Sequence, residues 1–303
     1  MRTIREINEK VIAGRRKTIA VAAADDMPVL AAVKDAVELG LAAAVLVGDE
    51  EKIQAALDEL GVHSDQIEVV HEPDRKAAAA RAVALVREGR AQVLMKGLIG
   101  TADFMRAVLN KERGLRTGRE LSHMAVIQVP QMDRLILMTD PAMHMYPTLE
   151  EKVKILEAAG EVCRALEIED PKAAAVCAVE VVNPAMPPTM DAAVLAQMSA
   201  RGQIKGVTVD GPLALDVALS PEAAAHKGLK GPVPGHADIL LMPNIEAGNV
   251  MWKTLVYMAK AQIAGTIVGA AAPIVLTSRS DSPETKLNSI ALALLLGQNA
   301  GGE

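Results

Sequence analysis

Short apolar runs alternate with stretches of helical length through most of the chain, and this alternation constrains the fold more than any other sequence feature. The run at 18–24 precedes a helix expected from about Pro28 to Leu39, closed by Gly40, and a second run follows at 42–48. Strands that are apolar throughout, separated by helices of about 10 to 15 residues, are typical of a parallel sheet covered on both faces. The pattern therefore predicts an α/β fold.

The alternation of apolar runs and helical stretches continues along the chain, and a second α/β series begins after Tyr146–Pro147. Two runs at 124–129 and 134–139 are separated only by a short polar turn, which predicts an antiparallel pair and hence a mixed, mostly parallel sheet. The second series indicates a second domain. Further strands are expected at 67–70, 92–95, 173–179, 206–211 and 237–243.

The composition excludes several classes of protein. The 303 residues include 32 Lys+Arg and 38 Asp+Glu, a formal net charge of −6, and only 1% are aromatic. Nucleic-acid binding needs phosphate neutralisation and usually base stacking, so we expect no nucleic-acid partner. Since half of the residues are hydrophobic, the chain is also too apolar to be disordered.

Cys163 and Cys177 show neither a CxxC spacing nor a histidine at ligand spacing. We expect two buried free thiols, neither a disulfide nor a zinc site, and a reducing compartment. The N-terminal 20 residues carry charges throughout, so no secretory signal is expected. The most apolar stretches, 263–276 and 290–296, are shorter than the roughly 18 residues of a membrane span. We therefore expect a cytoplasmic protein without a membrane partner.

The standard motifs for nicotinamide binding, P-loops, zincins and serine hydrolases are absent from the sequence. A different anion-site pattern follows the strand at 92–95, in the turn 96–101. Gly97 and Gly100 allow a ligand to approach the backbone closely, Lys96 adds charge, and Thr101 is expected to cap the next helix. Arg106, about one turn into that helix, could bind phosphate or carboxylate. A structural turn with exposed basic residues is the alternative.

A second turn of this kind follows the apolar run PIVLT. Ser278, Arg279 and Asp281 precede Ser282, which occupies an N-cap position with Pro283 at the first position of the final helix. An arginine between the end of a strand and the start of a helix suits an oxyanion or phosphate site at the carboxyl edge of a parallel sheet. The alternative is a capped helix with a surface arginine.

The segments PNIEAGN (243–249) and VDGPL (209–213), followed by Ser278-Arg279, resemble the phosphate acetyltransferase and butyryltransferase family. The stretches 96–109, 114–130 and 137–155 are more similar to the butyryltransferase branch. The resemblance covers nearly the whole chain.

The resemblance implies a two-domain α/β fold similar to the isocitrate and isopropylmalate dehydrogenases, with the active site in the interdomain cleft. On this basis residues 1–140 and 266–303 would form the first domain, and 141–265 the second. The resemblance also implies dimerisation through the second domain. The turns at 96–106 and 278–284 would then lie at the same sheet edge.

The implied reaction is reversible transfer of a short acyl group between coenzyme A and inorganic phosphate, with no metal and no bound cofactor. By hypothesis, phosphate attacks the thioester directly in a ternary complex. Ser278 and Arg279 match the catalytic pair of the family, and Arg106 matches an arginine expected to hold phosphate.

The sequence departs from the acetyltransferase branch at the base that deprotonates the thiol of CoA, because counting places Thr285 at that position. Asp281 and Glu284 are the nearby carboxylates, and Asp281 is preferred because it precedes the helix. Alternatively, the positive charge of Arg279 alone lowers the pKa of the thiol.

Three asparagines, Asn183, Asn244 and Asn249, are further candidates for substrate binding, or else order their loops. His144 is expected to be structural or solvated. Two alternative functions remain in view: a non-catalytic acyl-CoA-binding regulatory module of the same fold, and a metal-dependent decarboxylating dehydrogenase. The dehydrogenase would need a cluster of aspartates and a nicotinamide site, and neither pattern is present.

Overall fold

The computed structural model describes residues 1–278 and 281–299, and the chain divides into two compact domains. The first comprises Ile4–Arg119 and Ala264–Glu303; the second comprises Met1–Thr3 and Glu120–Ile263. The division differs from the expected boundary at residue 140, because the strand pair after residue 120 groups with the second domain. Hydrogen bonding explains this difference, since the second strand of the pair joins a strand near residue 240.

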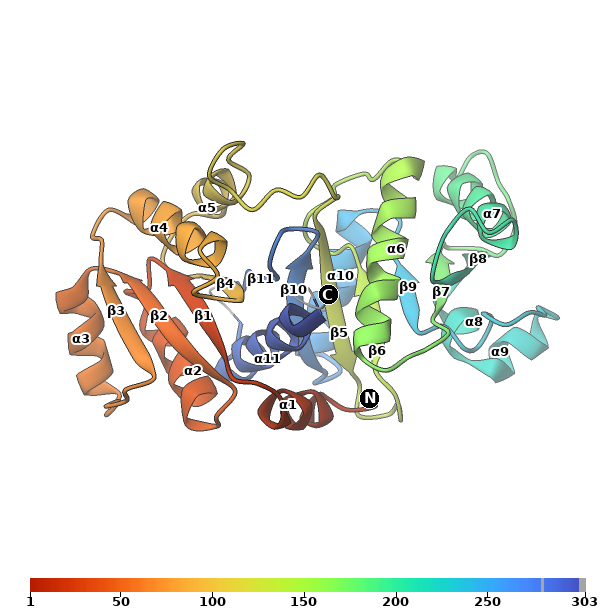
Figure 1. Ribbon diagram of the computed structural model, residues 1–303. Helices are drawn as coiled ribbons and strands as arrows, with labels where there is room; N and C mark the ends of the chain where they lie inside the picture. The colour runs from red at the N-terminus through yellow and green to blue at the C-terminus, as the bar shows by residue number, and fades with distance from the viewer. Residues whose placement is uncertain (279–280, 300–303) are drawn as a thin grey trace. The chain divides into compact units, whose positions relative to one another are not determined.

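The first domain contains six strands and six helices among the described residues (Figure 1). The strands expected at 42–48, 67–70 and 92–95 are confirmed to within one residue at each end. The strands are β1 (Lys17–Ala22), β2 (Ala42–Gly48), β3 (Ile67–His71), β4 (Val93–Lys96), β10 (Gln262–Val268) and β11 (Ile274–Val275). The helices are α1 (Ile4–Ala13), α2 (Met27–Glu38), α3 (Glu50–Glu59), α4 (Arg75–Arg87), α5 (Thr101–Val108) and α11 (Pro283–Asn299).

The strand order of the first domain is β3-β2-β1-β4-β11-β10. The pairs from β3 to β11 are parallel, and β10 runs antiparallel to β11. The chain proceeds outward from β1 to β3 and then returns to β4 on the other side of β1, so the order reverses between β1 and β4. In open α/β sheets, ligands bind outside the carboxyl ends of the strands at such a reversal.

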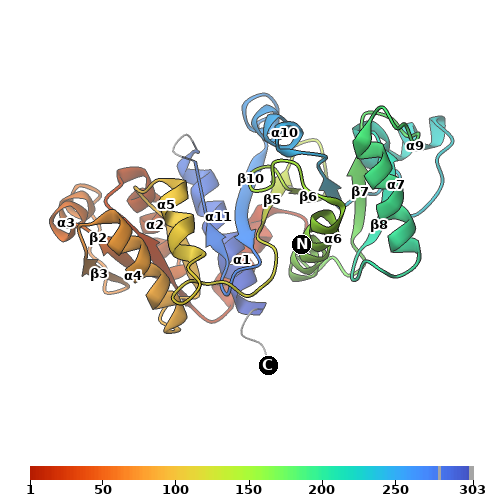
Figure 2. The same ribbon diagram turned by 90° about the horizontal axis from the view of Figure 1, so that it is seen from above.

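Helices cover both faces of this sheet. All four residues of β4 are buried, although successive side chains of a strand point to opposite faces. Right-handed crossovers place the helices of the outward path on one face and α4, on the return path, on the other. Accordingly α11 packs against α2 and α1, whereas α4 packs against α5 (Figures 1 and 2).

The second domain is a mixed α/β unit with five strands and five helices among the described residues. The strands are β5 (Ser122–Gln128), β6 (Ile136–Thr139), β7 (Lys172–Val176), β8 (Thr208–Leu213) and β9 (Ile239–Leu241). The helices are α6 (Leu149–Ala165), α7 (Pro187–Ala200), α8 (Leu215–Leu219), α9 (Pro221–His226) and α10 (Ile245–Tyr257).

The strand order of the second domain is β5-β6-β9-β7-β8. The antiparallel pairing of β5 with β6 confirms the expected pair. The four strands β6, β9, β7 and β8 run parallel to one another, so their carboxyl ends meet at one edge. The loops that follow these strands carry the sequence motifs of this domain.

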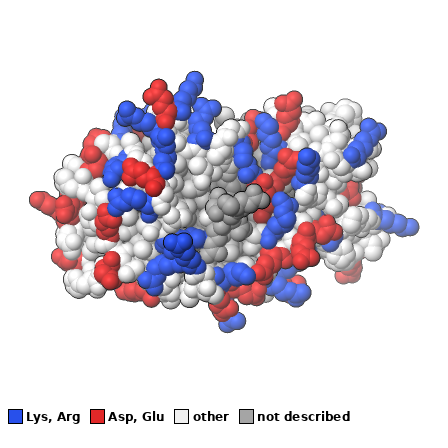
Figure 3. All heavy atoms as spheres, viewed as in Figure 1, with Lys and Arg blue, Asp and Glu red and all other residues white. Residues whose placement is uncertain are grey.

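The surface and the helices give two further observations. On the face drawn in Figure 3, basic and acidic side chains are interspersed, so the net charge of −6 is not concentrated in one acidic area there. Within the described part of the chain, none of the helices combines the length and the apolar character needed to cross a membrane.

Candidate functional site

The turn from β4 into α5 is held against the end of β1 by backbone hydrogen bonds. The amide of Gly97 donates to the carbonyl oxygen of Ala22 at 2.8 Å, and the amide of Leu98 donates to that of Ala23 at 2.7 Å. A Cβ atom at Gly97 would lie 2.2 Å from the Ala23 oxygen, so only glycine fits this approach. The turn therefore lies at the reversal of strand order.

The ammonium group of Lys96 turns back onto this loop. Only 8% of Lys96 is exposed, and its Nζ donates to the carbonyl oxygens of Gly97 at 3.2 Å and Ile99 at 3.1 Å. These bonds orient the turn and place a positive charge beneath it. Such a charge favours an anion above the turn.

The expected cap of α5 is wrong by one residue. Gly100 is the N-cap, with extended backbone angles, and Thr101 is already the first helical residue. Because Thr101 is already helical, its hydroxyl does not act as the cap, and Gly100 offers the first amides of α5 no side-chain partner. Arg106 lies on the last turn of α5, 69% exposed, and forms an ion pair with Asp103.

The turn from β11 into α11 has a local hydrogen-bond framework. The Oδ2 atom of Asp281 accepts a hydrogen bond from the amide of Ser278 at 2.7 Å. Ser282 accepts from the amide of Thr285 at 3.1 Å, which confirms Ser282 as the expected N-cap of α11. Arg279, the first candidate for catalysis, lies outside the described residues.

Two further charged side chains lie on α11 directly after this turn. Lys286 is 2% exposed, and its Nζ donates to the carbonyl oxygen of Asp281. Glu284 is exposed on the first turn of α11. Of the two proposed bases, Asp281 is therefore tied to the turn by hydrogen bonds.

The sheet brings both turns of the first domain to one edge. Strand β4 pairs with β11 in parallel, with Met95 opposite Val275. Since parallel neighbours end at the same edge, the segment that begins at Lys96 and the residues from Val275 to Ser278 leave the sheet at that edge. This placement was expected from the resemblance and is now seen in the strand register.

In the second domain the PNIEAGN segment packs onto the loop that follows β6. Asn244 caps α10, accepting a hydrogen bond from the amide of Ala247 at 2.9 Å. A Cβ atom at Gly248 would lie 2.8 Å from the Cα atom of Pro141, which explains the glycine. The side-chain Nδ2 atom of Asn249 donates to the Pro141 carbonyl oxygen at 3.5 Å. Both asparagines thus order the loops in this structure.

Asn183 lies farther from the sheet than expected. Strand β7 ends at Val176, so Asn183 belongs to the loop that leads into α7. Its Oδ1 atom accepts a hydrogen bond from the amide of Ala185 at 2.9 Å, and its own amide donates to Thr189 at 2.9 Å. The side chain closes an Asx turn in that loop.

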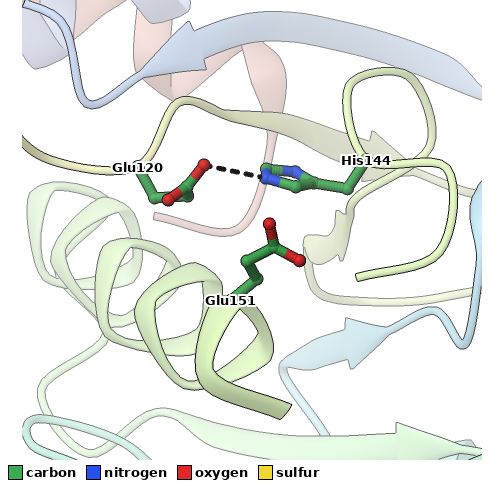
Figure 4. Close-up of side chains that lie close together, drawn as sticks. All are labelled: Glu120, His144 and Glu151. Carbon is green, nitrogen blue, oxygen red and sulfur yellow. Dashed lines mark hydrogen bonds and ion pairs between the residues drawn. The ribbon is translucent and has the colours of Figure 1, made fainter. Parts of the chain in front are cut away.

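A charged cluster surrounds His144, which sequence reasoning treated as structural or solvated (Figure 4). Its Nδ1 atom lies 2.9 Å from Oδ2 of Asp140, and its Nε2 atom lies 3.3 Å from Oε1 of Glu120. Glu151 lies next to the ring, at the start of α6. The hydrogen bond to Asp140 raises the pKa of His144 above its usual value, and Glu120 adds to this effect.

The cluster favours an ion pair. Ligand atoms of Glu120, His144 and Glu151 lie within 4.8 Å of one another, as in a metal site. However, a raised pKa favours the imidazolium form of His144, which has no lone pair for a cation. Glu151 also belongs to the capping box of α6, together with Thr148. We therefore interpret the cluster as a charged brace between β5, the loop after β6 and α6.

Sequence reasoning missed most of this brace. Asp140 is 3% exposed and accepts hydrogen bonds from the amides of His123, Ala142 and Met143. The sequence offered one signal, the i to i+4 spacing of an aspartate and a histidine directly after a predicted strand. Glu120 lies 24 residues from His144, so no local pattern could have connected them.

Comparisons with known proteins point to one family. The family model described as phosphate acetyl/butaryl transferase matches residues 2–81 and 71–294. The chain is 54% identical over 299 residues to a phosphate butyryltransferase of Clostridium acetobutylicum, with 99% of both chains covered. It is 46% identical over 280 residues to a phosphate acetyltransferase of Thermotoga maritima, covering 92% of this chain and 95% of the relative.

Solved structures show the same fold. The crystal structure of a branched-chain phosphotransacylase from Enterococcus faecalis matches with a TM-score of 0.83 and 36% identity, covering 93% of this chain and 99% of that one. A 4-hydroxythreonine-4-phosphate dehydrogenase from Klebsiella pneumoniae matches with a TM-score of 0.57 at 16% identity, covering 93% and 100%. The second match concerns the fold alone and supports the expected likeness to dehydrogenases.

The fold and these matches define an acyltransferase of the mixed α/β class. The chain belongs to the phosphate acetyl/butaryl transferase family, which confirms the resemblance drawn from its motifs. The interdomain position of the active site stays a prediction.

Proposed function

We propose that this acyltransferase moves a short acyl group, butyryl in the first instance, reversibly between coenzyme A and inorganic phosphate. The 54% identity to a phosphate butyryltransferase over nearly the full chain supports the butyryl group. One observation supports the proposed site: two turns follow the adjacent parallel strands β4 and β11 and therefore begin at the same edge of the sheet. The proposed substrates include branched acyl groups, because the chain is 36% identical to a branched-chain phosphotransacylase.

The proposed chemistry begins with phosphate held by the first turn. Lys96 lies in the turn, Gly100 gives the first amides of α5 no side-chain cap, and Arg106 has an exposed guanidinium on the last turn of the same helix. Arg106 is paired with Asp103, so phosphate would replace that carboxylate as its partner. A bidentate contact would then hold two phosphate oxygens.

Attack of a phosphate oxygen on the thioester carbonyl carbon forms the new C–O bond and breaks the C–S bond. Negative charge develops on the carbonyl oxygen and on the leaving sulfur. Ser278 and Arg279 are proposed to stabilise it, which is the usual role of preorganised donors in acyl transfer. In the reverse direction Asp281 takes the proton of the CoA thiol. The proposed chemistry uses no metal and no resident cofactor.

Remaining parts of the proposal concern binding, assembly and location. Asn183, Asn244, Asn249 and Glu284 are proposed to bind substrate, in addition to the loop contacts described above. The two cysteines are free and buried, which supports location in the cytoplasm.

A homodimer is proposed to form through the second domain. Helix α10 buries only Gly248 completely, whereas Val250, Tyr257 and Met258 are 65%, 68% and 79% exposed. Apolar side chains this exposed on α10 and at its C-cap, Met258, favour a protein interface. Light scattering should give the mass of a dimer, and Val250→Glu should shift it toward a monomer. A wild-type mass of one chain would contradict this part of the proposal.

The function is tested by measuring the free thiol released from acetyl-, butyryl- and octanoyl-CoA, with and without phosphate. Release that requires phosphate and is greatest with butyryl-CoA is the expected result. Isobutyryl-CoA, measured in parallel, tests the branched substrates. Binding of acyl-CoA without phosphate-dependent release would contradict the proposed function and favour a regulatory module.

A further inference from the structure

An apolar pocket of about 430 Å³ opens in the second domain at the carboxyl ends of two adjacent strands. Its walls come from the residues after β7, the residues after β9, and the first turns of α7 and α10. All of its lining residues belong to the second domain. Ligand pockets usually measure about 300–1,000 Å³ and favour this edge of an α/β sheet.

The lining offers hydrocarbon and sulfur to an occupant. Among the described residues that line the pocket, none is charged or aromatic, and the polar atoms are few. The hydroxyl of Thr189 is already engaged, accepting from the amide of Asn183 and donating to a loop carbonyl. Burial raises the pKa of the Cys177 thiol to about 11, so this group is protonated near neutral pH and behaves as a small apolar side chain.

This chemistry excludes the polar parts of a coenzyme as occupants. A nucleobase or a phosphate group would lose its hydrogen bonds with water and find no replacement on these walls. A saturated carbon chain has no hydrogen bonds with water to lose, and its burial is favourable because water is released from apolar surface. The pocket therefore fits the hydrocarbon end of a substrate.

A partly buried ion pair limits the depth of the pocket. The residues Val176 and Pro188 line both this pocket and a second space of only about 10 Å³. That second space is bounded by Lys152 and Asp191, whose Nζ and Oδ2 atoms lie 2.6 Å apart. Because there is no room beyond the shared wall, a chain that grows past it would meet a charged pair.

We propose that this pocket receives the hydrocarbon chain of the acyl group and that its lining residues set the preferred chain length. The inference rests on the acyl transfer proposed above and adds the residues that select among acyl groups. Ala178, Ala247 and Met186 are the residues assigned this role, because they line the pocket from the loop after β7, from α10 and from the N-cap of α7.

The test compares kcat/KM for acetyl-, butyryl- and hexanoyl-CoA in variants that fill or enlarge the pocket. Ala178→Leu and Ala247→Leu fill it, and each should lower the butyryl-to-acetyl ratio by about 10-fold or more, the scale on which one methylene is discriminated. Met186→Ala enlarges it and should raise the hexanoyl-to-butyryl ratio. Because each ratio is taken within one protein, a general loss of folded enzyme cancels.

Ala225→Leu is the matched control, since Ala225 is exposed on α9 in the same domain and does not line the pocket. Its ratios should equal those of the wild type. Phosphate-dependent release in which both filled variants keep the wild-type ratios would overturn the pocket assignment and leave the proposed function standing. Absence of phosphate-dependent release from any acyl-CoA in the wild type would overturn both.

A labelling experiment gives a readout that needs no turnover. A cysteine introduced as Ala178→Cys should react with a maleimide, and butyryl-CoA should slow this reaction more than acetyl-CoA at equal occupancy. Ala225→Cys, treated in the same way, should react at one rate with either ligand. Equal protection of Ala178→Cys by the two acyl-CoAs would contradict the proposal.

Discussion

The imidazole of His144 donates a hydrogen bond from Nδ1 to the buried carboxylate of Asp140, 2.9 Å away. Asp140 is the first residue after β6, so this bond closes the loop that contains both residues. The same carboxylate accepts three backbone amides, from His123, Ala142 and Met143. Burial alone would raise the pKa of Asp140, but the hydrogen bond from His144 and the other donors outweigh burial and lower it. The loop is therefore fixed by a charged pair.

This pair predicts a pH-dependent contribution to stability. The folded-state pKa of His144 is raised, so its contribution is fully present below the unfolded pKa of about 6.5 and is lost as pH rises through the folded value. His144→Gln should therefore cost more free energy of unfolding at pH 6 than at pH 9. Urea denaturation at the two pH values measures the difference.

The carboxylate side of the pair has the opposite dependence. Because the folded-state pKa of Asp140 is lowered, its contribution is present above about pH 4 and is lost as pH falls through the folded value. In Asp140→Asn, the pKa of His144 should fall, which an NMR titration of the ring would detect. His63→Gln, at an exposed position, is the control for His144→Gln. Equal losses of unfolding free energy for His144→Gln at pH 6 and pH 9 would refute the interpretation of His144 and Asp140 as a charged pair.

Gly97 should tolerate no side chain. A Cβ atom there would lie 2.2 Å from the carbonyl oxygen of Ala23 and 2.8 Å from that of Ala22, and both are backbone atoms that cannot rotate away. Gly97→Ala should therefore lower the free energy of unfolding by about 1–3 kcal/mol, the usual cost of overpacking, and should impair activity. Chemical denaturation and the thiol-release assay measure the two effects.

Gly100→Ala provides the comparison within the same turn. The space around Gly100 is open, with no atom within 4 Å of an added Cβ, and its φ of −64° suits any residue. The cost should stay below about 1 kcal/mol, since only the cap preference changes. Equal destabilisation by Gly97→Ala and Gly100→Ala would show that the close approach of Gly97 to Ala23 does not determine the geometry of the turn.

Much of this fold could be predicted from the sequence because most of its strands are buried on both faces. The segment at 42–48 is apolar and lies between Gly40 and Asp49, so the pattern located β2. The edge strand β3 was located to within one residue, although none of its residues is fully buried. Strand β10 was not predicted, because its sequence contains glycine and lies in one long apolar stretch that shows no strand boundaries. Its position depends on the pairing with β11.

The site could be predicted less completely, and the reason is physical. The turns after β4 and β11 follow from strand ends and helix starts, which are local. The brace around His144 and the pocket between α7 and α10 join residues far apart in the chain, so no spacing rule reveals them. The domain boundary was misplaced for the same reason, since the pairing of β6 with β9 decides it.

Substitution of Asp281 distinguishes a catalytic base from a residue that only positions the turn. Its carboxylate accepts the amide of Ser278 at 2.7 Å, and an asparagine could keep that bond but could not take a proton. If Asp281 is the base, as proposed, Asp281→Asn should lower kcat for acyl phosphate and CoA about 10²-fold or more, the usual contribution of a general base. The residual rate should rise with pH as the thiol ionises.

If Asp281 only holds the turn, Asp281→Asn should keep most of the activity and Asp281→Ala should lose it. Glu284→Gln is the matched control, because Glu284 is exposed on the first turn of α11 and has the same charge. A pH profile that changes with Glu284→Gln and not with Asp281→Asn would transfer the base role to Glu284. Steady-state rates between pH 6 and pH 9 distinguish these outcomes.

Arg279 carries the strongest prediction about turnover. It follows Ser278 in the sequence, and the proposed mechanism uses its guanidinium where charge develops in the transition state. Arg279→Ala should lower kcat by about 10²-fold or more. Arg279→Lys keeps the charge but loses the bidentate geometry, so its rate should lie between the two.

Arg15→Ala, at an exposed position in the first domain, is the control and should keep the wild-type rate. Stopped thiol-release assays with saturating butyryl-CoA and phosphate measure kcat directly, and a separate titration of phosphate gives its KM. A rise in KM for phosphate at constant kcat would instead place Arg279 in ground-state binding. Full activity of Arg279→Ala would remove it from the mechanism and leave the amides and Lys96 of the first turn as the charge-stabilising groups.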